Sequence, residues 1–183
     1  MLEATIVTTE DELAQIHQLN QLNLKQNLSE KEKKEEGFVS WLYSMKLLEQ
    51  MHKLAPSIIV KDEDKVVGYA LVTLKEAREF HPDLRTMITN LQPLHYNGKP
   101  LFTYSFYCMG QICIDKNYRG KGVFNNLYQH HKKIYQTKFD LLITEISTHN
   151  PRSQKAHEKV GFKTIHNYKD VMDEWNVVGW DWQ

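Results

Sequence analysis

The sequence has 183 residues, of which 41% are hydrophobic and 25% are charged. This length and composition are typical of one globular domain and argue against disorder as the main state. Lysine plus arginine and aspartate plus glutamate both number 23, so the chain has no net charge to attract nucleic acid or an anionic membrane. The composition therefore disfavours a nucleic-acid-binding protein, and electrostatic recognition must come from local clusters.

The chain has only two cysteines, Cys108 and Cys113, which lie in one predicted strand. Their odd separation predicts that they point to opposite faces of the sheet, where they could not form a disulfide. No segment approaches the roughly 20 apolar residues of a membrane-spanning helix. Because residues 1–13 have an acidic residue at Glu3 and no long apolar run, we expect no signal peptide there. We expect a reduced, cytoplasmic protein with no membrane partner.

Capping boxes mark the first two predicted helices. The first helix begins at Thr9, with Glu12 at the position that completes the box. A second pair, Ser29 with Glu32, begins a helix whose apolar residues recur at helical spacing until Pro56. The sequence therefore predicts one long second helix.

The strands of the first half are predicted from runs of β-branched residues. A short strand covers residues 4–9, and the runs 57–62 and 65–74 predict a hairpin. Residues 75–100 contain three prolines and are too long for a plain hairpin loop. We expect this segment to be a functional loop or lid over the substrate.

The second half alternates strands and helices. A long strand over residues 101–115 contains Gly110, and an interior glycine often marks a bulge or the close approach of another backbone. A helix from Val123 leads to a continuously apolar strand at 139–147, which predicts parallel pairing through a crossover helix. One helix and two strands complete the chain, at residues 153–161, 162–168 and 174–182. The fold class is α/β, with one domain over residues 1–183.

The turn 117–122 combines glycine with positive charge directly before a predicted helix. The first N–H groups of a helix have no partners within it, and the helix dipole places about half a positive charge there. Glycines at 120 and 122 would let a phosphate reach those N–H groups without meeting a Cβ atom. The P-loop and dinucleotide patterns do not match, so the turn predicts an anion site of another kind.

Two motifs in order resemble those of the GNAT superfamily of acyl-CoA-dependent N-acetyltransferases. Asn117-Tyr118-Arg119-Gly120-Lys121-Gly122 resembles the pyrophosphate-binding signature Q/R-x-x-G-x-G/A, although its first position departs from Gln or Arg. A register that starts at Arg119 matches Gly122 but places Phe124 where glycine or alanine is usual. The second motif, N-x-x-[AS]-x-x-x-[YH]-x-x-x-G-F, is matched at Asn150, Ser153, His157, Gly161 and Phe162.

The resemblance implies a single GNAT-like domain with a mixed central sheet that splays at a bulged strand and has helices on both faces. The pantetheine arm of acetyl-CoA would enter the opening like an added strand. Acetyl-CoA is the implied cosubstrate, and its acetyl group would pass directly to a primary amine. The implied cofactor-binding residues are Ile112, Cys113, Ile114, Arg119, Gly120, Lys121, Gly122, Val123, Phe124, Asn150 and Ser153.

Direct attack by an amine requires a base for the amine proton and help for the departing thiolate. His157 occupies a position that is often Tyr in the family, so the resemblance implies that it is the acid; simple packing is the alternative. Glu145 shares strand parity with Leu141 and Ile143, and desolvation on this apolar face would raise its pKa. Glu145 is the candidate base, with an exposed strand end or a structural ion pair as alternatives.

A different class of function stays open: a non-catalytic acyl-CoA-binding sensor or regulatory module on the same fold. The acceptor, a small-molecule or peptide amine, would contact the first two helices, the 75–100 segment and the aromatic tail. In that tail Trp180 and Trp182 share strand parity and either fill the core, line a cleft or form the contact of a homodimer. No ligand spacing accompanies His130 and His131, so we expect no metal.

Overall fold

The computed structural model describes residues 1–182, apart from the side chains of residues 34–36. The helices are α1 (Glu10–Leu22), α2 (Glu30–Glu36), α3 (Met45–Leu54), α4 (Pro82–Leu91), α5 (Val123–Tyr135) and α6 (Pro151–Val160). The strands are β1 (Leu2–Ile6), β2 (Ile58–Asp62), β3 (Lys65–Thr73), β4 (His95–Tyr96), β5 (Lys99–Pro100), β6 (Phe106–Ile114), β7 (Leu141–Ser147), β8 (Lys163–Lys169) and β9 (Glu174–Asp181). Short 3₁₀ helices lie at Lys25–Asn27, Lys75–Glu79, Leu101–Thr103 and Lys116–Tyr118.

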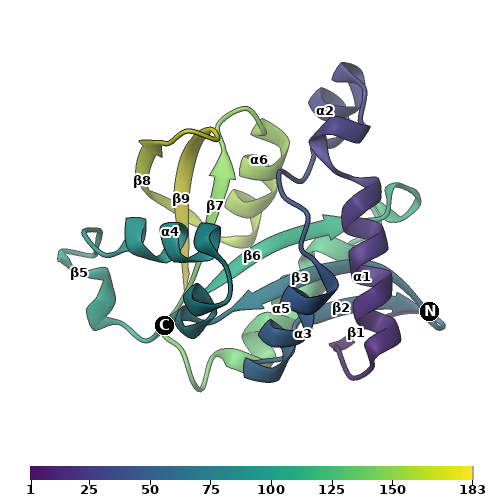
Figure 1. Cartoon of the computed structure of the whole chain (residues 1–183), viewed down its shortest axis with the longest axis horizontal. Coiled ribbons are helices and arrows are strands. Elements are labelled where there is room, and N and C mark those ends of the chain that lie inside the picture. The colour runs from purple at the N-terminus through teal and green to yellow at the C-terminus, as the bar shows by residue number, and fades with distance from the viewer. Residues whose placement is uncertain (183) are drawn as a thin grey trace.

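Seven strands form one mixed sheet in the order β1-β2-β3-β6-β7-β9-β8 (Figure 1). Neighbouring strands are antiparallel except β6 and β7, which are parallel and are connected by α5. Helices α1 and α3 pack on one face of the sheet and α5 packs on the other. The predicted hairpin, the parallel pair with its crossover helix and the α/β class are thus confirmed.

The sheet opens between β6 and β7. Their pairing covers only Phe106–Cys108 against Leu141–Ile143, and beyond it the described strands diverge (Figure 1). On the other edge of β6, the two steps from Ala70 to Val72 face the three from Met109 to Ile112, which places a bulge around Gly110. The predicted splayed sheet with a bulged strand is confirmed.

Gly110 is required at the bulge because two side chains crowd its backbone. A Cβ atom added there would lie 2.4 Å from Thr73 Oγ1 and 2.7 Å from the Tyr43 hydroxyl. Contacts this short do not occur for real Cβ atoms, so any other residue would displace a neighbour. The sequence signal of an interior strand glycine therefore has a steric cause.

The bulge also changes the direction of the two cysteines. Cys108 lies opposite Thr73 and Cys113 lies opposite Tyr69, and these two β3 residues have the same strand parity. Both cysteines consequently point to the same face of the sheet, and the predicted opposite orientation was wrong, because the bulge adds one residue between them. Both are buried and neither forms a disulfide.

The predicted long second helix was also wrong, because it is interrupted. Helix α2 ends at Gly37, whose φ of +76° leaves the helical region, and α3 begins only after the N-cap Ser44. Between them the chain is extended, and Val39 forms a parallel bridge with Leu24. The apolar residues of this stretch line a cavity instead of continuing a helix.

The segment predicted as a loop or lid is folded. It contains α4 and the β4–β5 hairpin, and its residues Ile88, Leu91, Leu94 and Tyr96 are buried against β7 and β9. The opposite side of α4 faces a cavity described below. The segment is therefore part of the core as well as a wall of that cavity.

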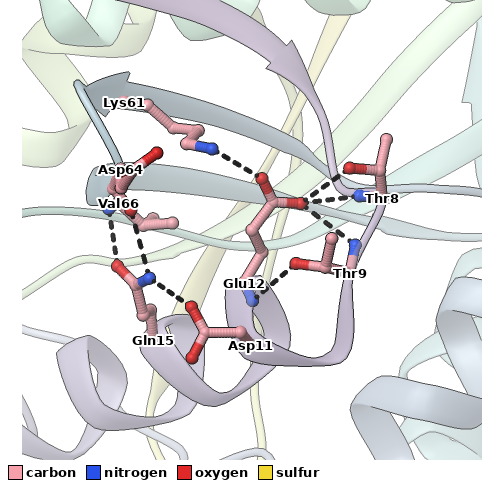
Figure 2. A network of polar contacts seen from close by, with 8 residues as sticks. All are labelled: Thr8, Thr9, Asp11, Glu12, Gln15, Lys61, Asp64 and Val66. Carbon is pink, nitrogen blue, oxygen red and sulfur yellow. Dashed lines mark hydrogen bonds and ion pairs between the residues drawn. The ribbon is translucent and has the colours of Figure 1, made fainter.

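A buried carboxylate fixes α1 to the sheet (Figure 2). Glu12 Oε2 accepts hydrogen bonds from the backbone N–H groups of Thr8 and Thr9, at 2.7 and 3.1 Å, and Oε1 accepts from Lys61 Nζ on β2 at 3.0 Å. The next turn adds Gln15, whose Oε1 accepts from the N–H of Val66 on β3 at 2.7 Å. The predicted capping box is confirmed, and it also joins α1 to two strands.

Candidate functional site

The glycine turn leaves the start of α5 open. Gly120 and Gly122 have φ values of +75° and +82°, and Gly122 is the N-cap of α5 with no side-chain capping bond. A Cβ atom added at either glycine would meet nothing within 4 Å. The N–H groups of the first helical turn therefore face a space without a capping side chain, as an anion site requires.

This turn forms one wall of a cavity of about 490 Å³, which we call the CoA cavity. Ten of the eleven predicted cofactor-binding residues line it: Ile112, Cys113, Ile114, Arg119, Gly120, Gly122, Val123, Phe124, Asn150 and Ser153. Lys121 does not line it; the side chain is exposed, and its Nζ lies 5.1 Å from the centre of the Tyr118 ring. The structure thus brings ten of the eleven residues together.

Arg119 ties the turn to its surroundings. Its Nε donates to the Ile114 carbonyl at 3.2 Å, and its Nη2 donates to Asn23 Oδ1 at 2.7 Å. These bonds join the end of β6 to the end of α1. Its guanidinium therefore stabilises the shape of the CoA cavity at the same time as it adds positive charge.

Several lining residues of the CoA cavity were not predicted. Arg152, for which the sequence favoured solvated surface over a phosphate contact, lines it together with Lys159. The two lie seven positions apart on one face of α6, and this spacing could have identified them as a pair. Asn23 and the stretch 37–39 also line it. The stretch was missed because it was predicted to lie inside a helix.

A second cavity of about 710 Å³, which we call the acceptor cavity, opens on the other side of the divergence between β6 and β7. Its walls come from residues 38–43, α4, the β6 bulge, β7, α6 and the turn between β8 and β9. Both predicted catalytic residues, Glu145 and His157, line it. The two cavities share five lining residues: Phe38, Val39, Ile112, Asn150 and Ser153.

Asn150 holds this junction together. Its Oδ1 accepts the N–H of Ser153 at 3.1 Å as the N-cap of α6, and its Nδ2 donates to the Phe38 carbonyl at 3.3 Å. A Cβ atom on Gly37 would lie only 3.2 Å from Asn150 Oδ1. The asparagine therefore fixes the stretch after α2 against α6, at the place where the cavities meet.

The Glu145 carboxylate is buried, and one of its two oxygens accepts no hydrogen bond from the described residues. This oxygen is Oε1. Burial raises the pKa of Glu145 to about 7, although a hydrogen bond from Tyr168 opposes part of this shift. A carboxyl with a pKa near neutrality can accept a proton and release it at physiological pH.

His157 is buried and neutral. Its Nδ1 lies 2.8 Å from the Ser153 carbonyl, which can only accept, so Nδ1 carries the proton. Its Nε2 then accepts from the Tyr128 hydroxyl at 2.6 Å. Burial lowers the pKa of His157 to about 4, with the Ser153 carbonyl opposing, so the ring is uncharged at neutral pH.

The aromatic tail divides between the core and the acceptor cavity. Trp180 and Trp182 pack against Tyr107 and Tyr128 in the core on the α5 face, so the core-filling alternative is the one observed. Trp175, at the start of β9, lines the acceptor cavity instead. The tail contributes one tryptophan to that wall.

The described residues contain neither a cluster of metal-binding side chains nor a membrane-spanning helix. Residues 1–182 contain no group of three or more His, Cys, Asp or Glu side chains that could hold a metal ion. Within that same range, every helix is too short or too polar to cross a membrane.

The fold is shared with solved N-acetyltransferase structures at low sequence identity. The ribosomal-protein-S18-alanine N-acetyltransferase from Escherichia coli superposes with a TM-score of 0.65 at 11% identity, covering 99% of this chain and 94% of that one. The NatC complex bound to Gag peptide and CoA gives 0.65 at 15% identity, covering 100% and 99%. An N-acetyltransferase from Staphylococcus aureus Mu50 gives 0.61 at 17%, covering 98% of each chain. Among curated proteins, none matches this sequence.

These likenesses define an acetyltransferase fold. A family model, the acetyltransferase (GNAT) family, matches residues 16–162, which is most of the chain. The protein belongs to the GNAT family.

Proposed function

We propose that this protein is an N-acetyltransferase that transfers the acetyl group of acetyl-CoA to a primary amine by direct attack. The observation that carries the proposal is the meeting of two cavities at the divergence of β6 and β7, with five shared lining residues. One cavity has an anion-binding helix start and the other a carboxyl with a pKa near 7. Two substrates could therefore meet at the junction in a fixed orientation.

The residues of the CoA cavity fit the cosubstrate. The uncapped start of α5 would bind the pyrophosphate, and Arg152 and Lys159 on α6 would add positive charge. The edge of β6 at Ile112–Ile114, which β7 has left, would hold the pantetheine amides through its backbone. Acetyl-CoA supplies an activated thioester carbonyl when it is bound.

Glu145 is the proposed base. An amine of ordinary pKa is protonated at neutral pH and must lose a proton before it attacks. Glu145 lines the acceptor cavity, and its buried Oε1 has no partner among the described residues. The carboxylate would take the amine proton, directly or through one water.

That His157 is the acid remains a proposal from the sequence. In the structure both of its ring nitrogens are already hydrogen-bonded. Its Nδ1–H is bound to the Ser153 carbonyl and its Nε2 accepts from Tyr128. To protonate the thiolate, His157 must first release its N–H from that carbonyl. Cytoplasmic location and a homodimer also remain predictions from the sequence.

The test combines binding and turnover on the whole chain. Calorimetry measures CoA affinity, and release of free CoA thiol measures acetyl transfer to a panel of primary amines. We expect saturable thiol release that depends on both acetyl-CoA and amine. Tight CoA binding without thiol release for any amine would favour the sensor alternative.

A further inference from the structure

The acceptor cavity offers mostly apolar surface. Four polar side chains on its walls are already paired inside the protein: Gln111 with the Trp41 carbonyl, Thr144 with the Met109 carbonyl, Ser147 with Asp173 and Asn150 with the Phe38 carbonyl. What these residues leave for a ligand is largely the aromatic and aliphatic side chains between them. Such a surface favours an apolar group on the ligand.

The main aromatic wall is held rigidly. Trp41 and Tyr43 pack with ring centres 4.2 Å apart, and both line the cavity. The Trp41 carbonyl accepts from Asn20 Nδ2 at 3.0 Å and from Gln111 Nε2 at 2.7 Å, while Asn20 Oδ1 accepts the Tyr43 N–H at 2.9 Å. Side chains from α1 and the β6 bulge therefore position this wall before any ligand binds.

The mouth of the cavity continues the apolar surface. Val171 and Met172, in the turn between β8 and β9, are 103% and 54% exposed, and both line the cavity. Large apolar side chains this exposed are few in the described part of the chain. Their position extends the apolar wall of the cavity outward to the protein surface.

The charged groups on the walls of the acceptor cavity favour a cation. Asp83, Glu145 and Asp170 line the cavity together with one lysine, Lys169. Asp170 is engaged by the N–H groups of its own turn, whereas Glu145 Oε1 has no partner among the described residues. Asp83 is half exposed and lies beside His81. Glu145 is thus the carboxylate within the wall to which the amine is best assigned.

We propose that the acceptor is a primary amine carried on a bulky apolar or aromatic group, with the amine at Glu145 and the apolar group against Trp41 and the β8–β9 turn. This inference rests on the proposed acetyl transfer. The same chemistry could come from a free arylalkylamine or from the N-terminal residue of a peptide, and the acceptors tested separate the two.

Two matched pairs of acceptors test the inference on the wild-type chain. 2-Phenylethylamine against ethanolamine, and phenylalaninamide against serinamide, each exchange a phenyl group for a hydroxyl. We expect kcat/KM to favour the phenyl member by about tenfold or more, because an apolar pocket discriminates strongly for buried hydrocarbon. A preference confined to the first pair indicates a free amine, and one confined to the second pair a peptide terminus.

Trp41→Ala removes the ring but keeps the backbone bonds of residue 41. We expect this variant to lower the phenyl preference to about threefold or less, mainly through a higher KM for the phenyl member, with CoA affinity unchanged. Leu54→Ala, an exposed position outside both cavities, is the matched control. If Trp41→Ala does not fold, Met87→Ala tests the facing wall of α4.

The possible failures are distinct. A phenyl preference below threefold in both wild-type pairs, with clear turnover of the hydroxyl members, overturns the acceptor class and leaves acetyl transfer standing. Turnover of none of the four amines, with CoA bound, overturns the proposed function and this inference together. An unchanged phenyl preference in a folded Trp41→Ala variant overturns the assigned wall.

Discussion

The Tyr128 hydroxyl of α5 lies 2.6 Å from Nε2 of His157 in α6, and the Nδ1 of the same ring lies 2.8 Å from the Ser153 carbonyl. Both ring nitrogens of His157 are therefore engaged within the protein. Phe124 packs edge-on against the ring at 5.1 Å and completes its surroundings. A histidine held in this way has no N–H directed at the cavity until the bond from Nδ1 to the Ser153 carbonyl breaks.

We expect His157→Ala to lower kcat by less than about tenfold and to leave CoA affinity within about threefold. The reason is that a neutral imidazole bonded on both sides is a weak proton donor. Steady-state kinetics and calorimetry on the folded variant measure the two quantities, with Tyr128→Phe as the companion. A kcat loss of about 10² or more at unchanged CoA affinity would instead assign proton donation to His157.

Glu145→Gln tests the proposed base. We expect kcat to fall on the order of 10²-fold or more, because the amide keeps the shape of the side chain but cannot accept a proton at its oxygen. In the wild type, kcat/KM should rise with pH through about 7 as Glu145 ionises. If Glu145 is the base, the rise of kcat/KM with pH disappears in the variant while CoA affinity is retained.

The same variant has a predictable effect on stability. Burial raises the pKa of Glu145 from 4.5 to about 7, so its contribution to stability is fully present below pH 4.5 and is lost as the pH rises toward and through 7. At pH 8 the buried carboxylate therefore costs roughly 3 kcal/mol. Chemical denaturation at pH 5 and pH 8 should show Glu145→Gln gaining stability relative to wild type at the higher pH. An equal difference at both pH values would mean that Glu145 titrates normally.

Local signals made much of the fold predictable. The capping boxes at Thr9 and Ser29 mark the starts of α1 and α2, because a cap is a contact between residues three positions apart. The glycine turn before α5 was predictable for a similar reason, and the continuous apolar run of β7 indicated a buried strand. Each of these features is decided within a short stretch of chain.

Features that depend on distant contacts were not predictable. Phe38 and Trp41 follow helical spacing, yet they lie in an extended stretch and line cavities. Their backbone carbonyls accept hydrogen bonds from Asn150 and Asn20, which belong to other parts of the chain. The strand parity of Cys113 changed because the bulge around Gly110 adds one residue to β6 relative to β3. The acceptor cavity combines six separate segments, and no single segment carries its pattern.

Glu12→Gln should lower the free energy of unfolding by about 1–3 kcal/mol at pH 7, because the neutral amide weakens the bonds to Thr8, Thr9 and Lys61 (Figure 2). Burial raises the pKa of Glu12, but these hydrogen bonds outweigh it and the net shift is downward. The stabilisation is thus present above the ordinary pKa and is lost as the pH falls through the lowered value.

Denaturation of both proteins at pH 7 and pH 3 measures this difference, which should shrink at pH 3. Glu10→Gln, in the same helical turn but exposed, is the control and should change stability by less than about 0.5 kcal/mol. A Glu12→Gln variant as stable as wild type at pH 7 would show that the carboxylate is not needed to hold α1 on the sheet.

Gly122→Asp tests the anion site at the start of α5, and Gly98→Asp provides its matched control. Both glycines have positive φ values, +82° and +76°, and a Cβ atom at either meets nothing within 4 Å. Aspartate should therefore cost each variant a similar stability, about 1 kcal/mol, through backbone strain alone. Only Gly122 lines the CoA cavity, where the new carboxylate would repel a pyrophosphate from the helix start. We expect calorimetry to show CoA affinity at least about tenfold weaker for Gly122→Asp and unchanged for Gly98→Asp; equal affinity in the two folded variants would remove this turn from the CoA site.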